Sequence, residues 1–335
     1  MAAPGAHILG CAGPVLTRDE IRFFGDAAPW GFILFERNLE NRDQIRALVT
    51  ELRAAVGRDA PVLIDQEGGR VQRLRTPLAR DWAPPLDDAA RASAPGRALY
   101  LRYRIIAEEL RGLGIDVNCA PIADIAGDTT HPVLRNRCYG TAPEPVTANA
   151  RAVAEGLMQG GVLPVLKHIP GHGRATLDSH LDLPHVTAAA ADLRMRDFRP
   201  FAALADLPLG MTAHIVFEAF DPDRPATVSP DVVRLIRQDL GFRGLLMTDD
   251  ISMQALEGSV AARSAAAIAA GCDVVLHCNG DLAEMQQVAT AAGALTERAA
   301  GRATAALAAR RPPSAIDIAA AEAELRNLLG NGVHV

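Results

Sequence analysis

Eight short apolar runs recur along the chain, and each is followed by polar residues and then by sequence with helical periodicity. Short apolar runs that contain β-branched residues and end in turn-forming or polar residues predict buried strands. The predicted strands span His7–Cys11, Gly31–Phe35, Pro61–Ile64, Asp116–Ile122, Val162–Leu166, Leu209–Ala213, Gly244–Met247 and Asp273–Leu276.

Between these runs, apolar residues keep to one face of a helix. After the second run, Asn41 and Gln44 resemble a capping arrangement and Gly57 predicts the helix end. The apolar face of this helix comprises Ile45, Leu48, Val49, Leu52 and Val56. Further helices are predicted at Ala255–Ala270, at 282–288 and, near the C-terminus, at Ser314–Leu329.

The alternation of strands and helices determines the predicted fold. Strands that alternate with helices favour a parallel sheet, and eight such units favour a (β/α)8 TIM barrel. An open, doubly wound sheet is the alternative. We expect one domain over residues 1–335, with the barrel at about 7–297 and a C-terminal extension at about 298–335 whose helix packs on the barrel.

Composition and charge exclude several partners. The 335 residues are 49% hydrophobic and 22% charged, as in globular proteins with a large core. A net charge of -6 argues against a nucleic acid or a membrane surface as partner. The sequence shows no signal peptide and no apolar run of the ~20 residues that span a membrane. The five cysteines lack CxxC spacing, so we expect reduced, mostly buried thiols in a cytoplasmic protein.

Charged and histidine side chains gather at the predicted strand ends. In a barrel these ends converge on one face, so residues far apart in sequence can share a pocket. Some of them could instead cap helices or hold loops, but so many strand ends of this kind favour a functional site. The residues are Asp65, Glu67, Asp124, Lys167, His168, His214, Asp249 and Asp250.

The stretch after the fifth predicted strand carries the densest cluster of reactive side chains. Lys167 and His168 end the strand, and a turn at 170–173 with a proline and two glycines prevents its continuation. A polar loop then places His180 two residues after Asp178. An aspartate bonded to one imidazole nitrogen fixes the tautomer and raises the basicity of the other nitrogen, so this pair predicts a general acid/base.

Two adjacent aspartates follow the seventh predicted strand. Asp249 comes directly after the buried run, where a rigid backbone and partial desolvation favour a nucleophile or an electrostatic stabiliser. Two neighbouring carboxylates that both pointed into one small site would repel each other. We therefore expect Asp250 to cap the helix that follows.

Several of these motifs together resemble a known family. They read KHIPGHG at 167–173, DSH at 178–180, IDQEGGRVQRL at 64–74 and TDDISM at 248–253. In this order they closely resemble bacterial β-N-acetylglucosaminidases of glycoside hydrolase family 3, of the single-domain cytoplasmic type that trims cell-wall fragments in peptidoglycan recycling. The resemblance covers nearly the whole chain.

The resemblance implies a role for each matching residue. Asp249 would be the nucleophile, and His180, supported by Asp178, the acid/base. The sugar would be bound by Asp65, Arg73, Arg137, Lys167 and His168. The family implies a retaining exo-glycosidase that removes terminal β-linked N-acetylglucosamine from GlcNAc-anhydroMurNAc-peptides. We expect no cofactor, no metal and a monomer whose partner is a small sugar or muropeptide.

The chemistry of a histidine acid/base fits retention and also leaves one alternative open. Retaining glycosidases hold the nucleophile and the acid/base roughly 5 Å apart, commonly as two carboxylates. A neutral histidine adds no like-charge repulsion, and its pKa of about 6.5 lies near the operating pH. A histidine also tolerates an incoming phosphate, which a carboxylate would repel, so a phosphorylase on the same scaffold is an alternative.

Two other classes of function remain as weaker alternatives. A metal-dependent barrel hydrolase would draw on the many histidines, but the first strand ends in Gly-Cys-Ala-Gly, which offers no conventional ligand set. A non-catalytic sugar-binding barrel would be expected to lack Asp249 or His180, and both are present.

Overall fold

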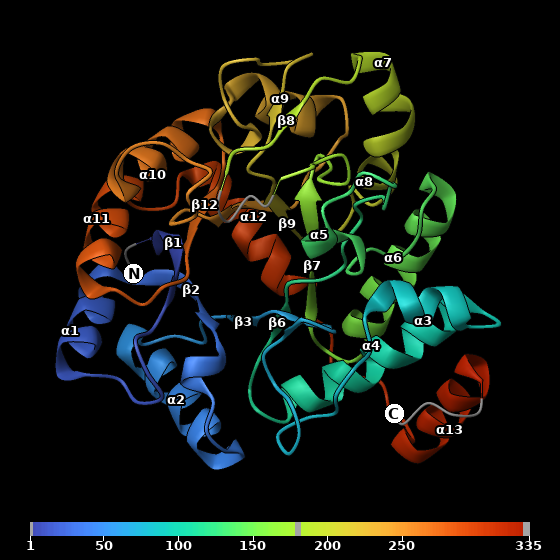
Figure 1. Cartoon of the computed structure of the whole chain (residues 1–335). Coiled ribbons are helices and arrows are strands. Elements are labelled where there is room, and N and C mark those ends of the chain that lie inside the picture. Colours follow the sequence, from blue (N-terminus) through green and yellow to red (C-terminus); the bar gives the residue numbers. More distant parts are fainter. Residues whose placement is uncertain (1–2, 178–181, 331–335) are drawn as a thin grey trace.

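The computed structural model describes residues 3–177 and 182–330. Within these residues, eight parallel strands close into a barrel in the order β1-β12-β11-β9-β7-β6-β3-β2, and helices surround it (Figure 1). The strands are β1 (Gly5–Gly10), β2 (Pro29–Leu34), β3 (Val62–Ile64), β6 (Val117–Asn118), β7 (Leu163–Ile169), β9 (Leu209–Thr212), β11 (Leu245–Asp250) and β12 (Val274–His277). The TIM barrel is confirmed, and the open-sheet alternative is wrong.

Helices cover the outside of the barrel, and shorter elements lie in the loops between them. The longer helices are α1 (Arg18–Ala27), α2 (Arg42–Val56), α4 (Pro95–Arg111), α6 (Pro143–Gln159), α9 (Pro230–Gln238), α10 (Val260–Ala270), α11 (Leu282–Ala292), α12 (Glu297–Ala308) and α13 (Ile318–Leu329). The shorter helices are η1 (Glu36–Asn38), α3 (Pro85–Arg91), α5 (Pro132–Arg135), α7 (Ala190–Asp192), η2 (Leu193–Asp197), α8 (Arg199–Ala203) and η3 (Ala226–Val228). The short strands β4 (Gln66–Gly68) and β5 (Val71–Gln72) pair with each other, as do β8 (His185–Val186) and β10 (Val216–Phe217).

The local signals for α2 are confirmed, whereas the predicted start of α10 is wrong. The Asn41 side chain accepts a hydrogen bond from the Gln44 backbone, and Gly57 ends α2 in the left-handed region at φ 64°. Helix α10 begins only at Val260, because Ser259 caps it by accepting from the Ala262 backbone. The prediction of a helix from Ala255 missed this cap.

The C-terminal helix also starts later than predicted. It was expected from residue 314, but α13 starts at residue 318, after Asp317 accepts a hydrogen bond from the Ala320 backbone. Helix α13 packs against α4, where Arg97 forms two hydrogen bonds with Glu324 at 2.7 and 2.8 Å. The contact confirms that a C-terminal helix packs on the barrel, while the exact domain limits remain a prediction.

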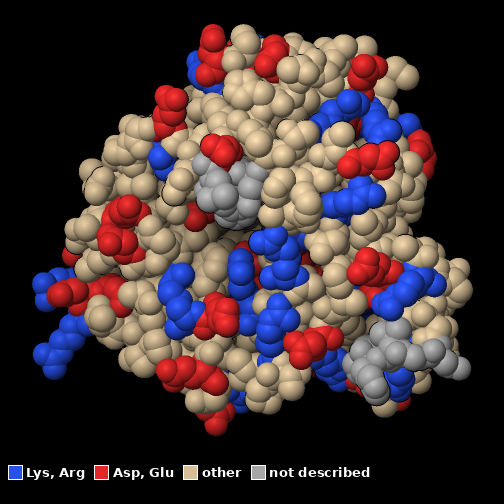
Figure 2. Space-filling view, in the orientation of Figure 1, with Lys and Arg blue, Asp and Glu red and all other residues tan. Residues whose placement is uncertain are grey.

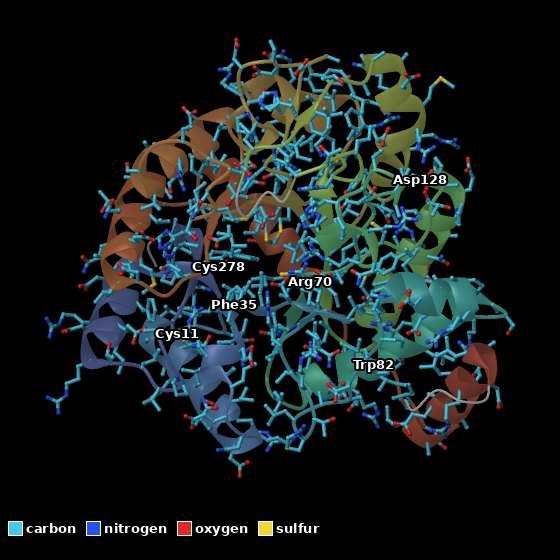
Figure 3. The ribbon with its side chains drawn as sticks, viewed as in Figure 1. Cys11, Phe35, Arg70, Trp82, Asp128 and Cys278 are labelled. Atoms are coloured by element: carbon cyan, nitrogen blue, oxygen red, sulfur yellow. The ribbon has the colours of Figure 1, made fainter. Side chains whose placement is uncertain are left out.

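The face seen in Figure 1 is the one on which the carboxyl ends of the strands converge. Figure 2 shows charges of both signs scattered over this face, with blue side chains gathered beside a hollow near its middle. Figure 3, in the same orientation, places Phe35, Arg70 and Cys278 near the centre of the face, whereas Trp82 lies nearer its edge. These central residues follow β2, β4 and β12 in the chain.

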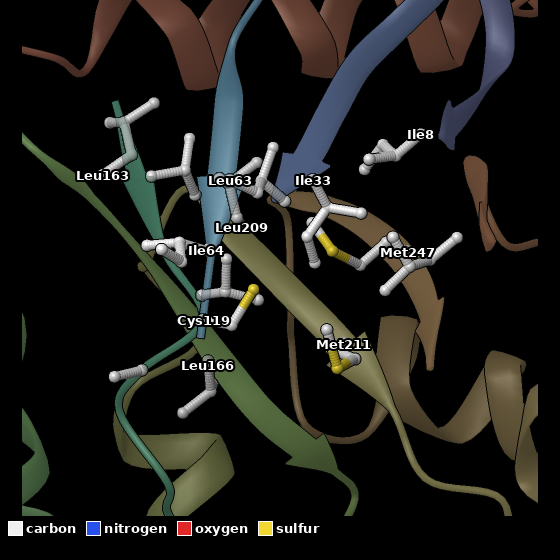
Figure 4. Close-up of a cluster of buried hydrophobic side chains, with 14 of the residues drawn as sticks. Ile8, Ile33, Leu63, Ile64, Cys119, Leu163, Leu166, Leu209, Met211 and Met247 are labelled. Atoms are coloured by element: carbon white, nitrogen blue, oxygen red, sulfur yellow. The ribbon is translucent and has the colours of Figure 1, made fainter. Parts of the chain in front are cut away.

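Buried apolar side chains on and next to the strands form the hydrophobic core (Figure 4). None of those labelled in the figure is more than 3% exposed: Ile8, Ile33, Leu63, Ile64, Cys119, Leu163, Leu166, Leu209, Met211 and Met247. All five cysteines are buried free thiols, as predicted. The core therefore forms a rigid floor under the residues at the strand ends.

Candidate active site

A cavity of about 330 Å³ opens among the carboxyl ends of the strands and the loops that follow them. Its lining is mixed, with apolar side chains such as Ile33 and Met211 next to charged ones such as Lys167 and Asp249. The lining comprises Ile33, Phe35, Asp65, Val71, Arg73, His131, Val133, Leu134, Arg137, Lys167, His168, His172, Leu177, Met211, Asp249, Asp250, Met253, Leu276 and Cys278.

Asp65 follows β3 and lies between two cations. Its carboxylate accepts from Lys167 Nζ at 2.9 Å and from Arg73 Nη2 at 3.1 Å. Burial alone would raise the pKa of Asp65, but attraction to Lys167 and Arg73 outweighs burial and holds that pKa below its usual range. Asp65 and Glu67 in turn raise the pKa of Lys167 despite its burial. Both groups are therefore ionised at neutral pH.

Glu67 is buried next to the cavity and holds two of the cations that line it, Arg137 and Lys167. Its fully buried carboxylate accepts from Arg137 Nε and Nη2, both at 2.8 Å, and from Lys167 Nζ at 2.7 Å. Burial opposes ionisation of Glu67, but Arg137 and Lys167 together lower its pKa. A bidentate contact fixes both the position and the plane of the Arg137 guanidinium. Glu67 thus orients Arg137 and Lys167.

Asp124 holds two histidines at the cavity wall. Its Oδ2 lies 2.7 Å from His168 Nδ1, and its Oδ1 accepts from the His172 backbone at 2.6 Å. Burial disfavours the charged carboxylate, yet His168 and the other contacts lower the pKa of Asp124. Because a carboxylate can only accept, the His168 proton lies on Nδ1, and a neutral His168 keeps its acceptor lone pair on Nε2. Burial lowers the pKa of His172 to about 4.

Asp249 lies near the end of β11, where its carboxylate meets the cavity. One oxygen, Oδ1, accepts from the Asp250 backbone at 2.8 Å. Desolvation would raise the pKa of Asp249, but electrostatic attraction to His168 and His214, together with the backbone contact, lowers that pKa. Asp249 is therefore a partly desolvated carboxylate that is ionised at neutral pH, as a carboxylate nucleophile must be.

Asp250 stabilises the loop next to Asp249 and does not cap α10. Its carboxylate accepts from the backbone and hydroxyl of Ser252, at 3.1 and 2.8 Å, and from the Cys278 backbone at 3.2 Å. Its carbonyl oxygen lies 3.0 Å from His214 Nε2, which therefore carries the imidazole proton. The prediction of a cap is wrong because these nearer donors satisfy the carboxylate and Ser259 caps α10.

The predicted site residues that the structure describes all come together. Asp249, with the five predicted sugar-binding residues Asp65, Arg73, Arg137, Lys167 and His168, lines the one cavity described above. Asp178 and His180 lie outside the described residues. His131 and Phe35 also line the cavity, but no motif marked them as site residues, because only the folded loops bring them there.

Two structural findings concern metals and membranes. Across residues 3–177 and 182–330, no group of three or more histidine, cysteine, aspartate or glutamate side chains is arranged to hold a metal ion. Among the helices that the structure describes, none has both the length and the apolar composition to cross a membrane.

Comparisons with known proteins agree on one family. Residues 28–306 match the family model described as glycosyl hydrolase family 3 N terminal domain. A β-hexosaminidase from Methylococcus capsulatus is 40% identical over 277 residues, which cover 80% of each chain. One from Stenotrophomonas maltophilia is 37% identical over 287 residues, covering 83% of this chain and 84% of that one.

Solved structures extend the similarity to almost the full length. Native NagZ from Neisseria gonorrhoeae superposes with a TM-score of 0.86 at 30% identity and covers 98% of both chains. The same protein in complex with N-trifluoroacetyl-D-glucosamine gives a TM-score of 0.85 at 30% identity, again over 98% of both chains.

Proposed function

The chain belongs to glycosyl hydrolase family 3 and is a β-hexosaminidase, and on this basis we propose that it is a retaining exo-glycosidase that releases terminal N-acetylglucosamine from peptidoglycan fragments. The observation that carries the proposal is the ionised Asp249, which lines the same cavity as Asp65, Lys167 and Arg137. At about 330 Å³, the cavity lies near the lower end of ligand-pocket volumes, roughly 300–1,000 Å³. That size supports recognition of one terminal sugar.

Asp249 acts as the nucleophile. Its carboxylate attacks the anomeric carbon of the bound sugar while the bond to the aglycone oxygen breaks, so a glycosyl ester forms with inversion. Water then attacks the same carbon from the opposite face and releases Asp249, so the net result is retention. His168 and His214 support this role because their electrostatic effect favours the ionised carboxylate in a partly desolvated place.

His180 is the proposed acid/base, with Asp178 as its partner. This assignment rests on the resemblance of the DSH motif at 178–180 to the family pattern, because both residues lie outside the described part of the chain. As acid, the imidazolium protonates the departing aglycone oxygen, and as base, the neutral imidazole takes a proton from the attacking water. Asp178 stabilises the imidazolium and fixes the tautomer of the neutral imidazole.

Five side chains bind the sugar in this account: Asp65, Arg73, Arg137, Lys167 and His168. The ionised Asp65 accepts hydrogen bonds from hydroxyl groups, and Lys167 and Arg137 donate to ring substituents. His168 adds the Nε2 acceptor that its contact with Asp124 leaves open. Their mutual ion pairs keep the charges in place before the sugar arrives, so little ordering is needed on binding.

The resemblance also supports a natural substrate and a setting. We propose that the aglycone is anhydroMurNAc-peptide, produced during peptidoglycan recycling in the cytoplasm, and that the enzyme works as a monomer without a cofactor. The rival phosphorylase would resolve the glycosyl ester with phosphate and release a sugar 1-phosphate.

Comparing two aryl glycosides tests the proposal. The purified protein should hydrolyse aryl β-N-acetylglucosaminide at least about tenfold faster, in kcat/KM, than aryl β-glucoside. The rate should not depend on phosphate, no sugar 1-phosphate should form, and EDTA should have no effect. Equal turnover of both glycosides would contradict the sugar specificity, phosphate-dependent release of sugar 1-phosphate would establish the phosphorylase, and inactivation by EDTA would favour the metal-dependent hydrolase.

A further inference from the structure

Arg37 lies at the rim of the cavity without a carboxylate partner among the described residues. Its guanidinium donates from Nε to the Cys11 carbonyl at 3.0 Å and from Nη2 to the Cys278 carbonyl at 2.5 Å. Both acceptors are neutral, so the positive charge is held in place but is not compensated by an anion. Because Cys278 lines the cavity, the held charge lies at the edge of the site.

Phe35 connects this charge to the cavity. Its ring lines the cavity, and the guanidinium carbons of Arg37 and Arg73 lie 5.1 and 4.9 Å from its centroid. Arg73 is paired with Asp65 inside the site, whereas Arg37 lies towards the solvent. A series of contacts therefore connects Asp65, through Arg73 and the Phe35 ring, to the uncompensated guanidinium of Arg37.

Arg70 adds a second cation to the same rim. It is exposed in the turn between β4 and β5, next to Val71, which lines the cavity. Figure 3 labels Arg70, like Phe35 and Cys278, near the centre of this face. Within the described part of the chain, no hydrogen bond or ion pair engages its guanidinium. Arginines elsewhere are commonly paired, as Arg97 is with Glu324.

We propose that Arg37 and Arg70 form a subsite that binds a carboxylate on the aglycone. The inference rests on the proposed function, because a terminal sugar bound above Asp249 leaves its aglycone at the mouth of the cavity. Guanidinium groups bind carboxylates in a bidentate manner, and Arg37 is already held in place by two carbonyl groups. Phe35 provides an apolar surface for the aglycone between the sugar and these cations.

Paired substrates that differ in one charge test the subsite. Both are GlcNAc-anhydroMurNAc-Ala-D-Glu γ-methylamide, in which the lactyl group is already amide-linked to the peptide. One keeps the free α-carboxylate of the glutamate, and in the other that carboxylate is converted to the neutral methylamide. The wild-type kcat/KM for the acid should exceed that for the amide by about tenfold, as expected for one charge-assisted contact. About 0.5 M NaCl should reduce this ratio, because salt screens exposed charges.

Arg70→Gln is the deciding variant, because Arg70 is exposed and its loss breaks no described contact. The acid-to-amide ratio should fall from about tenfold towards two- or threefold, since Arg37 remains. Arg37→Gln should also lower the ratio, with circular dichroism as a check of folding because Arg37 holds two carbonyl groups. Arg298→Gln is the matched control: it removes an exposed arginine on α12, away from this cavity, and should keep the wild-type ratio.

The outcomes separate the subsite from the proposed function. Turnover of the acid and the amide at equal kcat/KM, or a ratio that Arg70→Gln leaves unchanged, would overturn the subsite while the glycosidase stands. A protein that turns over neither of these substrates nor an aryl β-N-acetylglucosaminide would overturn the proposed function itself, and the subsite with it. A ratio that falls in Arg70→Gln and not in Arg298→Gln establishes the subsite.

Discussion

The two ends of the barrel each hold a carboxylate between two cations, but the charge is stabilised at one end and disfavoured at the other. At the carboxyl ends of the strands, Asp65 contacts Lys167 and Arg73 beside the cavity. Those contacts outweigh burial and lower the pKa of Asp65. The ionised carboxylate therefore remains available to a ligand.

Asp116 occupies the corresponding place at the amino-terminal ends of the strands. Its carboxylate accepts from Arg53 Nη2 at 2.5 Å and from the Val62 backbone at 3.1 Å, and it also pairs with Arg310. Burial nevertheless outweighs these contacts and raises the pKa of Asp116. This carboxylate joins α2, β3 and the segment after α12, so its partners serve the fold.

The comparison shows that an ion pair alone does not mark a functional site. What distinguishes the carboxyl-terminal end is a carboxylate kept ionised beside a cavity, with further cations fixed by Glu67 below it. Variants at the cavity should therefore change catalysis more than stability, and variants at the amino-terminal end should do the reverse.

The largest expected effect comes from the nucleophile. Asp249→Ala should lower kcat at least about 10³-fold, because no other group can form the glycosyl ester. Asp250→Ala should lower it less, since Asp250 stabilises only the adjoining loop, and Asp116→Asn should leave it near the wild-type value. Steady-state kinetics on an aryl β-N-acetylglucosaminide measures all three. Equal, modest losses in the two adjacent aspartates would contradict the assignment.

The next effect should appear in both stability and kinetics. Glu67→Gln leaves Lys167 and Arg137 without their shared buried anion, which should cost about 3–5 kcal/mol of unfolding free energy and also lower kcat/KM. Asp273→Asn is the matched control at the amino-terminal end, because Asp273 lies between Arg237 and Arg302 at 2.6 and 2.7 Å. It should reduce stability without changing kcat/KM of the folded enzyme. Unchanged kinetics in Glu67→Gln would contradict the comparison.

The smallest expected effect tests the sign of the two pKa shifts. The lowered pKa of Asp65 means that its charge stabilises the fold above the ordinary carboxyl pKa of about 3.9, and this contribution is lost as the pH falls. The raised pKa of Asp116 means that its contribution is fully present below that value and is lost as the pH rises.

Replacing each carboxylate by a neutral asparagine, in Asp65→Asn and Asp116→Asn, tests whether the two pKa shifts have opposite signs. As the pH falls from about 5 to about 2.5, the stability deficit of Asp65→Asn relative to wild type should shrink. As the pH falls from about 7 to about 4, the deficit of Asp116→Asn should grow. Denaturant unfolding at several pH values measures both deficits. Deficits that change in the same direction would show that the two carboxylates are energetically alike.

Sequence patterns predicted the fold correctly, but they were less accurate about where individual strands and helices begin and end. Apolar runs identified all eight barrel strands, because strands covered on both faces are apolar throughout. Strand β6 is nevertheless only two residues long, although its apolar run continues to Ile122. Pro121 within that run has no N–H to donate to a ladder, and Ile122 forms only an isolated bridge with Lys167.

The site was predictable where motifs and strand ends coincide. Asp65, Lys167 and Asp249 each follow or end a strand, so sequence alone indicates that they converge. The positioning roles of Glu67 and Asp124 could not be predicted, since they depend on contacts between side chains 44 to 100 positions apart. The cavity position of Phe35 and the uncompensated charge of Arg37 likewise emerge only from tertiary packing.

The most direct test of the account is to trap the glycosyl ester on Asp249. In His180→Ala, a dinitrophenyl β-N-acetylglucosaminide still reacts because its leaving group needs no proton, while hydrolysis of the ester is slowed. Mass spectrometry should then show one N-acetylglucosaminyl group on Asp249 in the peptide that contains TDDISM, and azide should release it as the β-glycosyl azide. No adduct, or an adduct on another residue, would contradict the account.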